Sequence, residues 1–155
     1  MNGQKGFSLI ELMVVMAILS AVAAVAIPAY MDWYPNYKLN EASRDLYSDM
    51  QNARVTAART KQNVLAIFVA GAYTPAGEIG SYQIFIDTNG DNALSAGETI
   101  IRQKTMPRFV TLTLSNFNGG NTAGFTSRGL PWNNATGEVR FRNNQARHHR
   151  LRLSR

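Results

Sequence analysis

The chain has 155 residues, which is enough for one modest domain and an appendage. It contains no cysteine, so disulfides, thiolate nucleophiles and thiolate metal sites are excluded. The formal net charge of +6 is unevenly placed: residues 1–139 hold equal numbers of acidic and basic side chains, whereas residues 140–155 hold six arginines and no acid. A charge-driven partner must therefore contact this basic tail.

The amino-terminal region contains twenty consecutive residues, 12–31, without a formal charge. As a helix this stretch is about 30 Å long, which matches the hydrocarbon core of a bilayer. Apolar side chains all round the helix favour a membrane span over a buried core helix. A removable secretory signal is a further alternative, since the small residues of SAVAAVA could precede its cleavage site.

The segment KGFSLIELMVV, residues 5–15, resembles the class III signal of type IV pilins and type II secretion pseudopilins. It has a glycine, an aromatic residue, Ser-Leu, and a glutamate four residues beyond the aromatic one. The resemblance implies that prepilin peptidase cuts after Gly6 and methylates the new terminal amine of Phe7. Residues 1–6 are then a leader peptide, and residues 7–31 stay on the mature protein as a transmembrane and filament-core helix.

Glu11 lies at the edge of this apolar segment. A carboxylate inside a bilayer costs roughly 2.5–3.5 kcal/mol on insertion scales, so it needs a positive partner or a place among the headgroups. The resemblance implies a partner, namely the Phe7 amine of a neighbouring subunit during assembly. The alternative is an unpaired Glu11 at headgroup level. Pro28 removes one backbone hydrogen bond, which predicts a kink or local melting of the helix, and such breaks are common in stalks of this family.

Residues 32–62 are more polar but keep a helical period, which predicts the amphipathic half of one long helix that reaches about Thr60. Pro35 predicts a second irregularity in it. The apolar positions that recur every three or four residues are Leu39, Ala42, Leu46, Met50, Ala53 and Ala57.

After this helix the pattern changes to short β-branched and aromatic runs separated by turn residues. We expect strands at residues 63–70, 81–88, 99–105, 109–115, 124–129, 137–143 and 149–154. One helix followed by strands predicts an α+β fold, in which the amphipathic helix packs on an antiparallel β-sheet head of residues 63–155.

The head also carries a resemblance. LYSDMQNARVTAARTKQNV, FIDTNGDNALSAGETIIR, FTSRGLP and GEVRF are similar to segments of H-type minor pseudopilins and of T-type fimbrial minor pilins. The resemblance implies a structural subunit of a type II secretion pseudopilus or a type IV pilus tip, anchored in the bacterial inner membrane by a single span with its head in the periplasm. The implied partners are other pilins, prepilin peptidase and the inner-membrane assembly platform. Many relatives end in Gly-Arg-x-Arg, whereas this chain ends in HHRLRLSR, which puts any function of that element in doubt.

The basic tail is the second candidate site. Arginine forks suit phosphate oxygens, and the T-type relatives imply DNA capture in natural transformation. Acidic partner pseudopilins, anionic lipid and plain solvation are the alternatives. Alternation along a strand places Arg140 and Arg142 on one face of their strand, and Arg150 and Arg152 on one face of theirs. The six residues are Arg140, Arg142, Arg147, Arg150, Arg152 and Arg155.

DTNGDNALSAGE, residues 87–98, has the spacing of a calcium loop, with Asp87, Asn89, Asp91 and Glu98 at its first, third, fifth and twelfth places. The sixth place is Asn92 rather than glycine and the flanks are strands, so the sequence favours a polar hairpin connection without metal.

The remaining chemistry is sparse. His148 and His149 are adjacent, so on a strand they face opposite sides and do not chelate one metal together. No spacing of serine, aspartate and histidine singles out a catalytic site. We therefore expect no enzyme activity and no cofactor.

Overall fold

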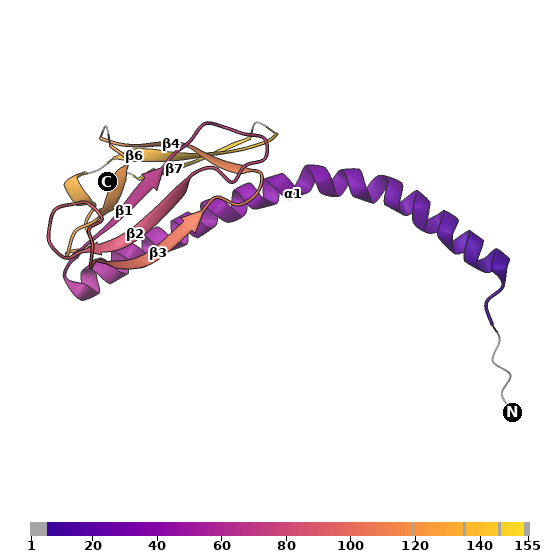
Figure 1. Cartoon of the computed structure of the whole chain (residues 1–155), viewed down its shortest axis with the longest axis horizontal. Helices are drawn as coiled ribbons and strands as arrows, with labels where there is room; N and C mark the ends of the chain where they lie inside the picture. Colours follow the sequence, from indigo (N-terminus) through magenta and orange to yellow (C-terminus); the bar gives the residue numbers. More distant parts are fainter. Residues whose placement is uncertain (1–5, 119, 135, 146, 154–155) are drawn as a thin grey trace, which may run out of the picture. The chain divides into compact units, whose positions relative to one another are not determined.

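The structure is a computed structural model that describes residues 6–118, 120–134, 136–145 and 147–153. The chain divides into two compact units, residues 1–34 and 35–155. One long helix precedes two antiparallel sheets (Figure 1), which confirms the predicted α+β class.

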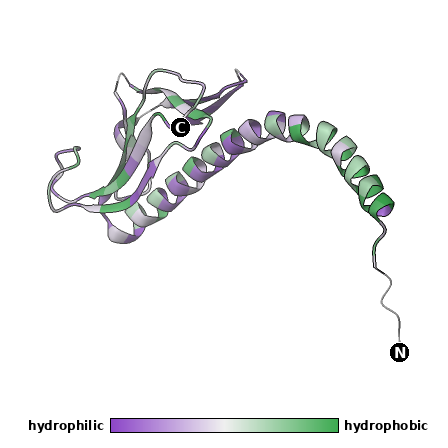
Figure 2. Cartoon of the chain, turned by 45° about the vertical axis from the view of Figure 1, so that its right-hand side comes forward, coloured by the Kyte–Doolittle hydropathy of each residue, from purple (hydrophilic) through white to green (hydrophobic). Residues whose placement is uncertain are grey.

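The helix α1 runs from Leu9 to Thr60 without a break. Its first half is apolar and its second half alternates between apolar and polar faces (Figure 2). Both Pro28 and Pro35 lie within the uninterrupted helix, so the predicted local melting at Pro28 is wrong, whereas its alternative, a kink at Pro28, and an irregularity short of a break at Pro35 stay predictions. Each proline removes only one N–H, and the hydrogen bonds of the flanking turns keep the helix closed.

The head unit contains two sheets rather than the single sheet that the sequence indicated. The first has the order β3-β2-β1-β5 and the second the order β4-β6-β7, and every pairing is antiparallel. A single 3₁₀ turn, η1 (Trp132–Asn134), lies between β5 and β6. The strands are β1 (Asn63–Val69), β2 (Ser81–Asp87), β3 (Thr99–Thr105), β4 (Val110–Phe117), β5 (Thr122–Phe125), β6 (Gly137–Asn143) and β7 (His148–Leu153).

The strand expected at residues 124–129 is wrong in its bounds. β5 ends at Phe125, and the chain then turns. The Gly129 amide donates to the Thr126 carbonyl at 2.7 Å, and the Thr126 amide donates to the Leu130 carbonyl at 2.8 Å. Gly129 has φ +72°, a conformation that glycine adopts without strain and that ends a strand.

The core lies where α1 meets the inner faces of the sheets. The predicted apolar stripe of α1 is buried against Phe68, Tyr82 and Phe141, which are themselves fully buried. The Phe68 ring contacts Tyr82 and Phe117 with centroids 6.0 and 5.4 Å apart. Burial of this stripe explains why the second half of α1 is helical, since packing rather than propensity supplies most helix stability.

One buried carboxylate joins α1 to the first sheet. The Tyr82 hydroxyl donates to Asp49 Oδ2 at 2.7 Å, and Arg102 Nε donates to Asp49 Oδ1 at 3.2 Å. Burial, together with the hydrogen bond to Asp49, raises the pKa of Tyr82 well above its usual range. A second ion pair, Lys104–Asp45, lies beside this network and also connects β3 to the helix.

Candidate functional site

The peptide bond after Gly6 lies outside regular structure. Residues 6–8 are non-helical, and α1 begins at the next residue. Nothing lies within 4 Å of a Cβ built on Gly6, and Phe7 is 82% exposed. An uncrowded backbone outside regular structure is what a peptidase needs to bind a cleavage site. Residues 1–5 of the predicted leader lie outside the described residues.

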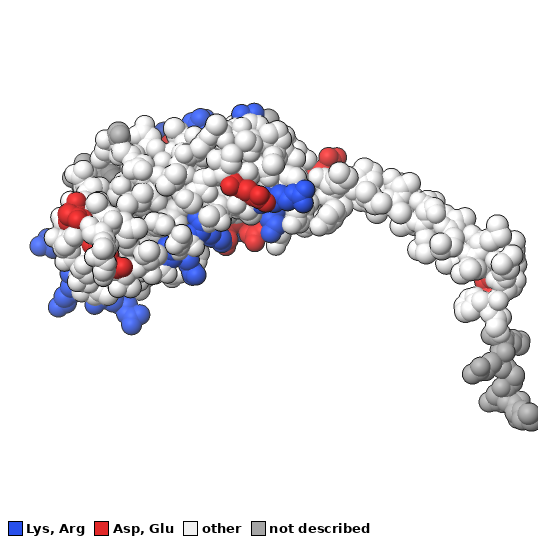
Figure 3. Space-filling model, in the orientation of Figure 1, with Lys and Arg blue, Asp and Glu red and all other residues white. Residues whose placement is uncertain are grey.

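The apolar first half of α1 is solvent-exposed. Its most apolar 18-residue window is long and apolar enough to cross a membrane, and none of that window is buried. Figure 3 shows this part of the chain almost free of charge. The hydroxyl of Ser20 donates to the Met16 carbonyl at 2.7 Å, so it is satisfied within the helix. Exposed apolar surface on this scale marks a segment that is covered by lipid or by another protein.

Glu11 lies in the first turn of α1 and is exposed. Within the described residues it makes no ion pair. Ser8 stands three residues before it, and the Ser8 carbonyl accepts the Leu12 amide at 3.2 Å. Ser-x-x-Glu is the pattern of a capping box, and an acid in the first turn also complements the helix dipole. Glu11 therefore has a local role at the helix start as well as a charge available to a partner.

The end of the apolar segment carries aromatic residues that sequence reasoning missed. Tyr30 stacks on Tyr34 with centroids 5.4 Å apart, and it contacts Trp33 at 6.4 Å. Tyr30 and Trp33 are each 57% exposed. Amphipathic rings of this kind gather where a span leaves the hydrocarbon. Their position at the carboxyl end of the uncharged run, residues 12–31, was the signal that could have identified them.

The basic tail forms one face of the β6–β7 pair. The register places Arg140 opposite Arg150, Arg142 opposite His148, and Glu138 opposite Arg152. The six side chains of these three pairs share this face, because Val139 and Phe141, which alternate with them along β6, point into the core. His149 is opposite Phe141, on the other face from His148.

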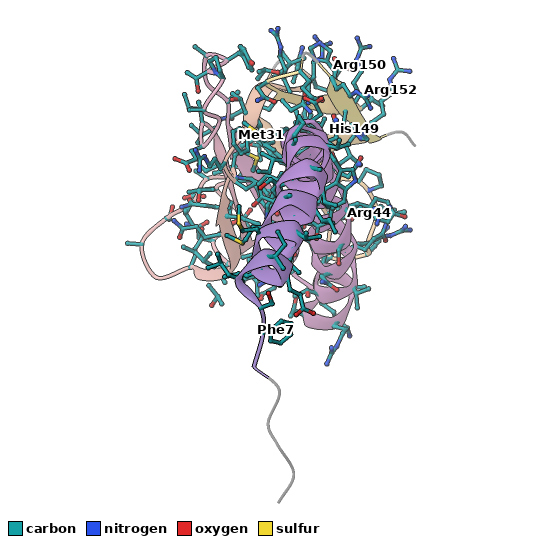
Figure 4. The ribbon with its side chains drawn as sticks, turned by 90° about the vertical axis from the view of Figure 1, so that its right-hand side faces the viewer. Phe7, Met31, Arg44, His149, Arg150 and Arg152 are labelled. Carbon is teal, nitrogen blue, oxygen red and sulfur yellow. The ribbon has the colours of Figure 1, made fainter. Side chains whose placement is uncertain are left out.

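The structure corrects the expectation that these arginines have no acid beside them. Arg140 Nη2 contacts Glu138 Oε1 at 2.7 Å, and the Arg142 guanidinium lies 4.1 Å from the centroid of the Tyr73 ring. Both side chains are half-buried, whereas Arg147, Arg150 and Arg152 are exposed. Figure 4 shows Arg150 and Arg152 pointing outward from β7. Arg155 lies outside the described residues. Three arginines of the tail are thus accessible to a partner.

The β2–β3 connection brings together acids that are separated in sequence. One carboxylate oxygen from each of Asp87, Asp91 and Glu98 lies within 4.8 Å of the others. Asn89 does not add a ligand atom to that cluster, since its amide nitrogen donates to Asp91 Oδ2 at 2.8 Å and its oxygen accepts the Asp91 amide at 3.0 Å. The connection joins two antiparallel strands as a hairpin, which the sequence favoured, and it gathers three acidic side chains.

Comparison with known families gives two matches. The family described as type II transport protein GspH matches residues 42–155, and the prokaryotic N-terminal methylation motif matches residues 1–27. Together they cover the head and the amino-terminal signal, and the first covers well over half of the chain.

Several pilins are similar over shorter stretches. A fimbrial protein of Moraxella nonliquefaciens is 55% identical over 42 residues, 27% of each chain. The type IV major alpha-pilin of Moraxella bovis is 50% identical over 46 residues, 30% of this chain and 29% of the relative. The type IV major pilin protein PilE1 of Neisseria gonorrhoeae is 49% identical over 53 residues, 34% of this chain and 31% of the relative. The chain thus covers less than a third of each relative. No solved structure matches it.

Proposed function

The chain belongs to the family of type II transport protein GspH and carries the methylation motif of prepilins, and from this premise we propose that it is a minor pseudopilin. It is a structural subunit without catalytic activity, assembled into a type II secretion pseudopilus or a type IV pilus tip. Before assembly it is anchored by a single span in the inner membrane, with its head in the periplasm.

The observation that carries this proposal is the fully exposed apolar half of α1. Before assembly, lipid covers it. In a filament, neighbouring helices replace the lipid, and close van der Waals packing between helices supplies the stabilisation. The aromatic residues Tyr30 and Trp33 mark the level at which the helix leaves the bilayer.

Processing creates the charge that Glu11 requires. Cleavage after Gly6 leaves a protonated amine on Phe7, and methylation of that amine keeps it basic. Glu11 of an incoming subunit pairs with the Phe7 amine of the preceding one, which sets the axial register of the helices. An unpaired carboxylate transferred into a filament core is costly, whereas the paired one is tolerated. Ser8 and the helix dipole hold Glu11 at the start of the helix.

Two measurements test the proposal. Mass spectrometry of the protein recovered from membranes is expected to give an amino terminus at a methylated Phe7, whereas a terminus near Ala26 identifies a removed secretory signal and overturns the proposal. Cross-linking of assembled filaments is expected to show several-fold lower incorporation of Glu11→Val. Asp32→Asn, which removes one negative charge beyond the apolar segment, is the control and is expected to be incorporated normally.

A second candidate function, contact with DNA during natural transformation, is favoured by one observation. Arg147, Arg150 and Arg152 are exposed together on β7 and the turn before it. Three guanidinium groups on a rigid edge suit the phosphates of a nucleic acid backbone. Because Arg140 pairs with Glu138 and Arg142 is half-buried against Tyr73, these three are the exposed arginines among the described residues of the tail, which weakens the site relative to a six-arginine cluster.

A further inference from the structure

The proposed assembly and DNA contact make no use of the acidic β2–β3 connection. The register pairs Ile86 with Thr99, so the next residues along the two strands are Asp87, the last of β2, and Glu98, directly before β3. Like charges facing each other across an antiparallel pair are destabilising. Asp91 adds a third carboxylate to the same place.

The geometry of these oxygens fits one cation. They lie within 4.8 Å of each other, and two ligands on opposite sides of one Ca²⁺ are about 4.6–5.2 Å apart. The described residues, which include the whole of the connection, place no lysine or arginine in an ion pair with any of the three acids. Among the described residues, the cluster therefore holds three carboxylates with no counter-charge.

Asp87 provides an independent observation that points to a ligand. It is 4% exposed, and its Oδ1 accepts the Gly90 amide at 2.7 Å. Its Oδ2 is buried and has no hydrogen-bond partner. A buried carboxylate oxygen without a partner is strongly destabilising, and it is retained in proteins where a cation or a donor completes it. A metal bound between the acids supplies what Oδ2 lacks.

The other two acids are held in place before any cation arrives. Asp91 accepts hydrogen bonds from the Ser95 hydroxyl at 2.6 Å and the Ala93 amide at 2.8 Å. Glu98 accepts the Thr88 amide at 3.1 Å and the Ser95 amide at 3.0 Å. These hydrogen bonds hold the carboxylates in place and occupy some of their lone pairs. Each carboxylate keeps further acceptor positions that a cation can use.

We propose that the β2–β3 connection binds one Ca²⁺ through carboxylate oxygens of Asp87, Asp91 and Glu98. Backbone carbonyls of the connection and water complete the coordination, as in other flexible oxygen sites. The sequence argued against this because Asn92 replaces the glycine expected at the sixth place. In the structure Asn92 has φ 62°, the left-handed conformation that glycine would adopt there and that asparagine tolerates. The objection drawn from Asn92 therefore falls away, and of the two objections from sequence only the flanking strands remain.

The expected affinity is that of extracellular calcium modules, with Kd about 10⁻⁴–10⁻³ M, because the site is exposed at Asp91 and offers three carboxylates. Such a site is filled outside the cytoplasm and empty inside it. Binding closes the end of the hairpin by replacing repulsion between Asp87 and Glu98 with shared coordination. The head is then stabilised in the compartment in which a pseudopilin works.

The test uses the full chain in detergent micelles, stripped of metal with a chelator. Isothermal titration with CaCl₂ is expected to show one ion per chain, with half-saturation at about 0.1–1 mM, and thermal melts are expected to shift upward over the same range. MgCl₂ is expected to give a much weaker response. Absence of a heat signal and of a melting shift up to about ten times that range overturns the proposal, and an equal response to Mg²⁺ overturns the choice of calcium.

Two variants separate binding from folding. In Asp91→Asn and Glu98→Gln the calcium affinity is expected to fall at least tenfold. Without metal, both are expected to remain folded, which their melting curves check, because the amide oxygen that replaces the carboxylate still accepts hydrogen bonds. Glu78→Gln, which neutralises an exposed acid outside the connection, is expected to keep the full calcium response. A response that persists in the first two variants, or that is lost in Glu78→Gln as well, contradicts a site at these residues.

Discussion

The contact between Tyr82 and Asp49 holds α1 on the first sheet, and its loss is predicted to weaken the head measurably. Tyr82→Phe removes the hydroxyl that donates to Asp49 Oδ2 at 2.7 Å and leaves the ring, which is fully buried, in place. No cavity forms, so the effect isolates one hydrogen bond. Asp49 is 9% exposed, so water does not readily replace the lost donor.

The magnitude follows from the kind of bond. A hydrogen bond to a charged group contributes about 1.5–3 kcal/mol, and an unsatisfied buried acceptor costs about the same. Arg102 Nε still contacts the other oxygen of Asp49 at 3.2 Å. We therefore expect Tyr82→Phe to lower the free energy of unfolding by about 2 kcal/mol. For a head of residues 35–155, 1 kcal/mol corresponds to a change of about 4 °C in Tm. The expected loss is therefore about 8 °C.

The assay is a thermal melt of the protein in detergent at pH 7, followed by near-ultraviolet circular dichroism. Tyr47→Phe is the matched control: it makes the same chemical change at a side chain of α1 that is 58% exposed. The control is expected to stay within about 0.5 kcal/mol of the wild type. If Tyr82→Phe melts no lower than Tyr47→Phe, the buried hydrogen bond does not hold the helix and the reasoning is wrong.

Two further predictions concern pH and salt. Burial and the hydrogen bond to Asp49 keep Tyr82 protonated in the folded head at a pH where an unfolded tyrosine, with a pKa of about 10, has ionised. The wild type is therefore expected to lose stability above pH 10, by up to about 1.4 kcal/mol per pH unit from this residue. The difference in Tm between the wild type and Tyr82→Phe is expected to narrow between pH 9 and about 11. If Arg147, Arg150 and Arg152 bind phosphates, duplex affinity measured by fluorescence anisotropy is expected to fall with log salt at a slope of about −2.7, reduced to about −0.9 in Arg150→Gln/Arg152→Gln. An unchanged slope in that variant, with Arg59→Gln as control, contradicts DNA binding by the tail.

The elements of the fold were predictable because their signals are periodic and local. The stripe from Leu39 to Ala57 predicted the buried face of α1, and alternating β-branched residues predicted strands such as β1 and β2. The division into two sheets was not predictable from one sequence. It depends on which strands pair across long separations, such as β1 with β5, and periodicity carries no information about pairing.

The residues of the candidate sites could be identified from the sequence, but the sequence did not show which of their charges are paired within the fold. The six tail arginines were recognised, yet their partners Glu138 and Tyr73 come from outside the tail, and Tyr73 is separated from Arg142 by most of the head sequence. In the acidic connection the ligand spacing was visible, whereas the burial of Asp87 Oδ2, on which the calcium proposal depends, arises only once β2 is packed. Local spacing thus finds the groups, and tertiary packing decides whether they are free to bind.

The helix α1 is one element with two different sources of stability, and this difference is what connects the fold to the proposed function. From Leu39 onward its apolar stripe is buried by the head itself, together with the bond from Tyr82 to Asp49. Before Pro28 its apolar residues are exposed, and an apolar helix in water has no comparable source of stability. Its cover must therefore come from outside the chain, first from lipid and then from other helices. A force that extracts the first half from the membrane acts on the head through the same continuous helix, so the contacts of Asp49 must resist it if subunit and head are to enter the filament together.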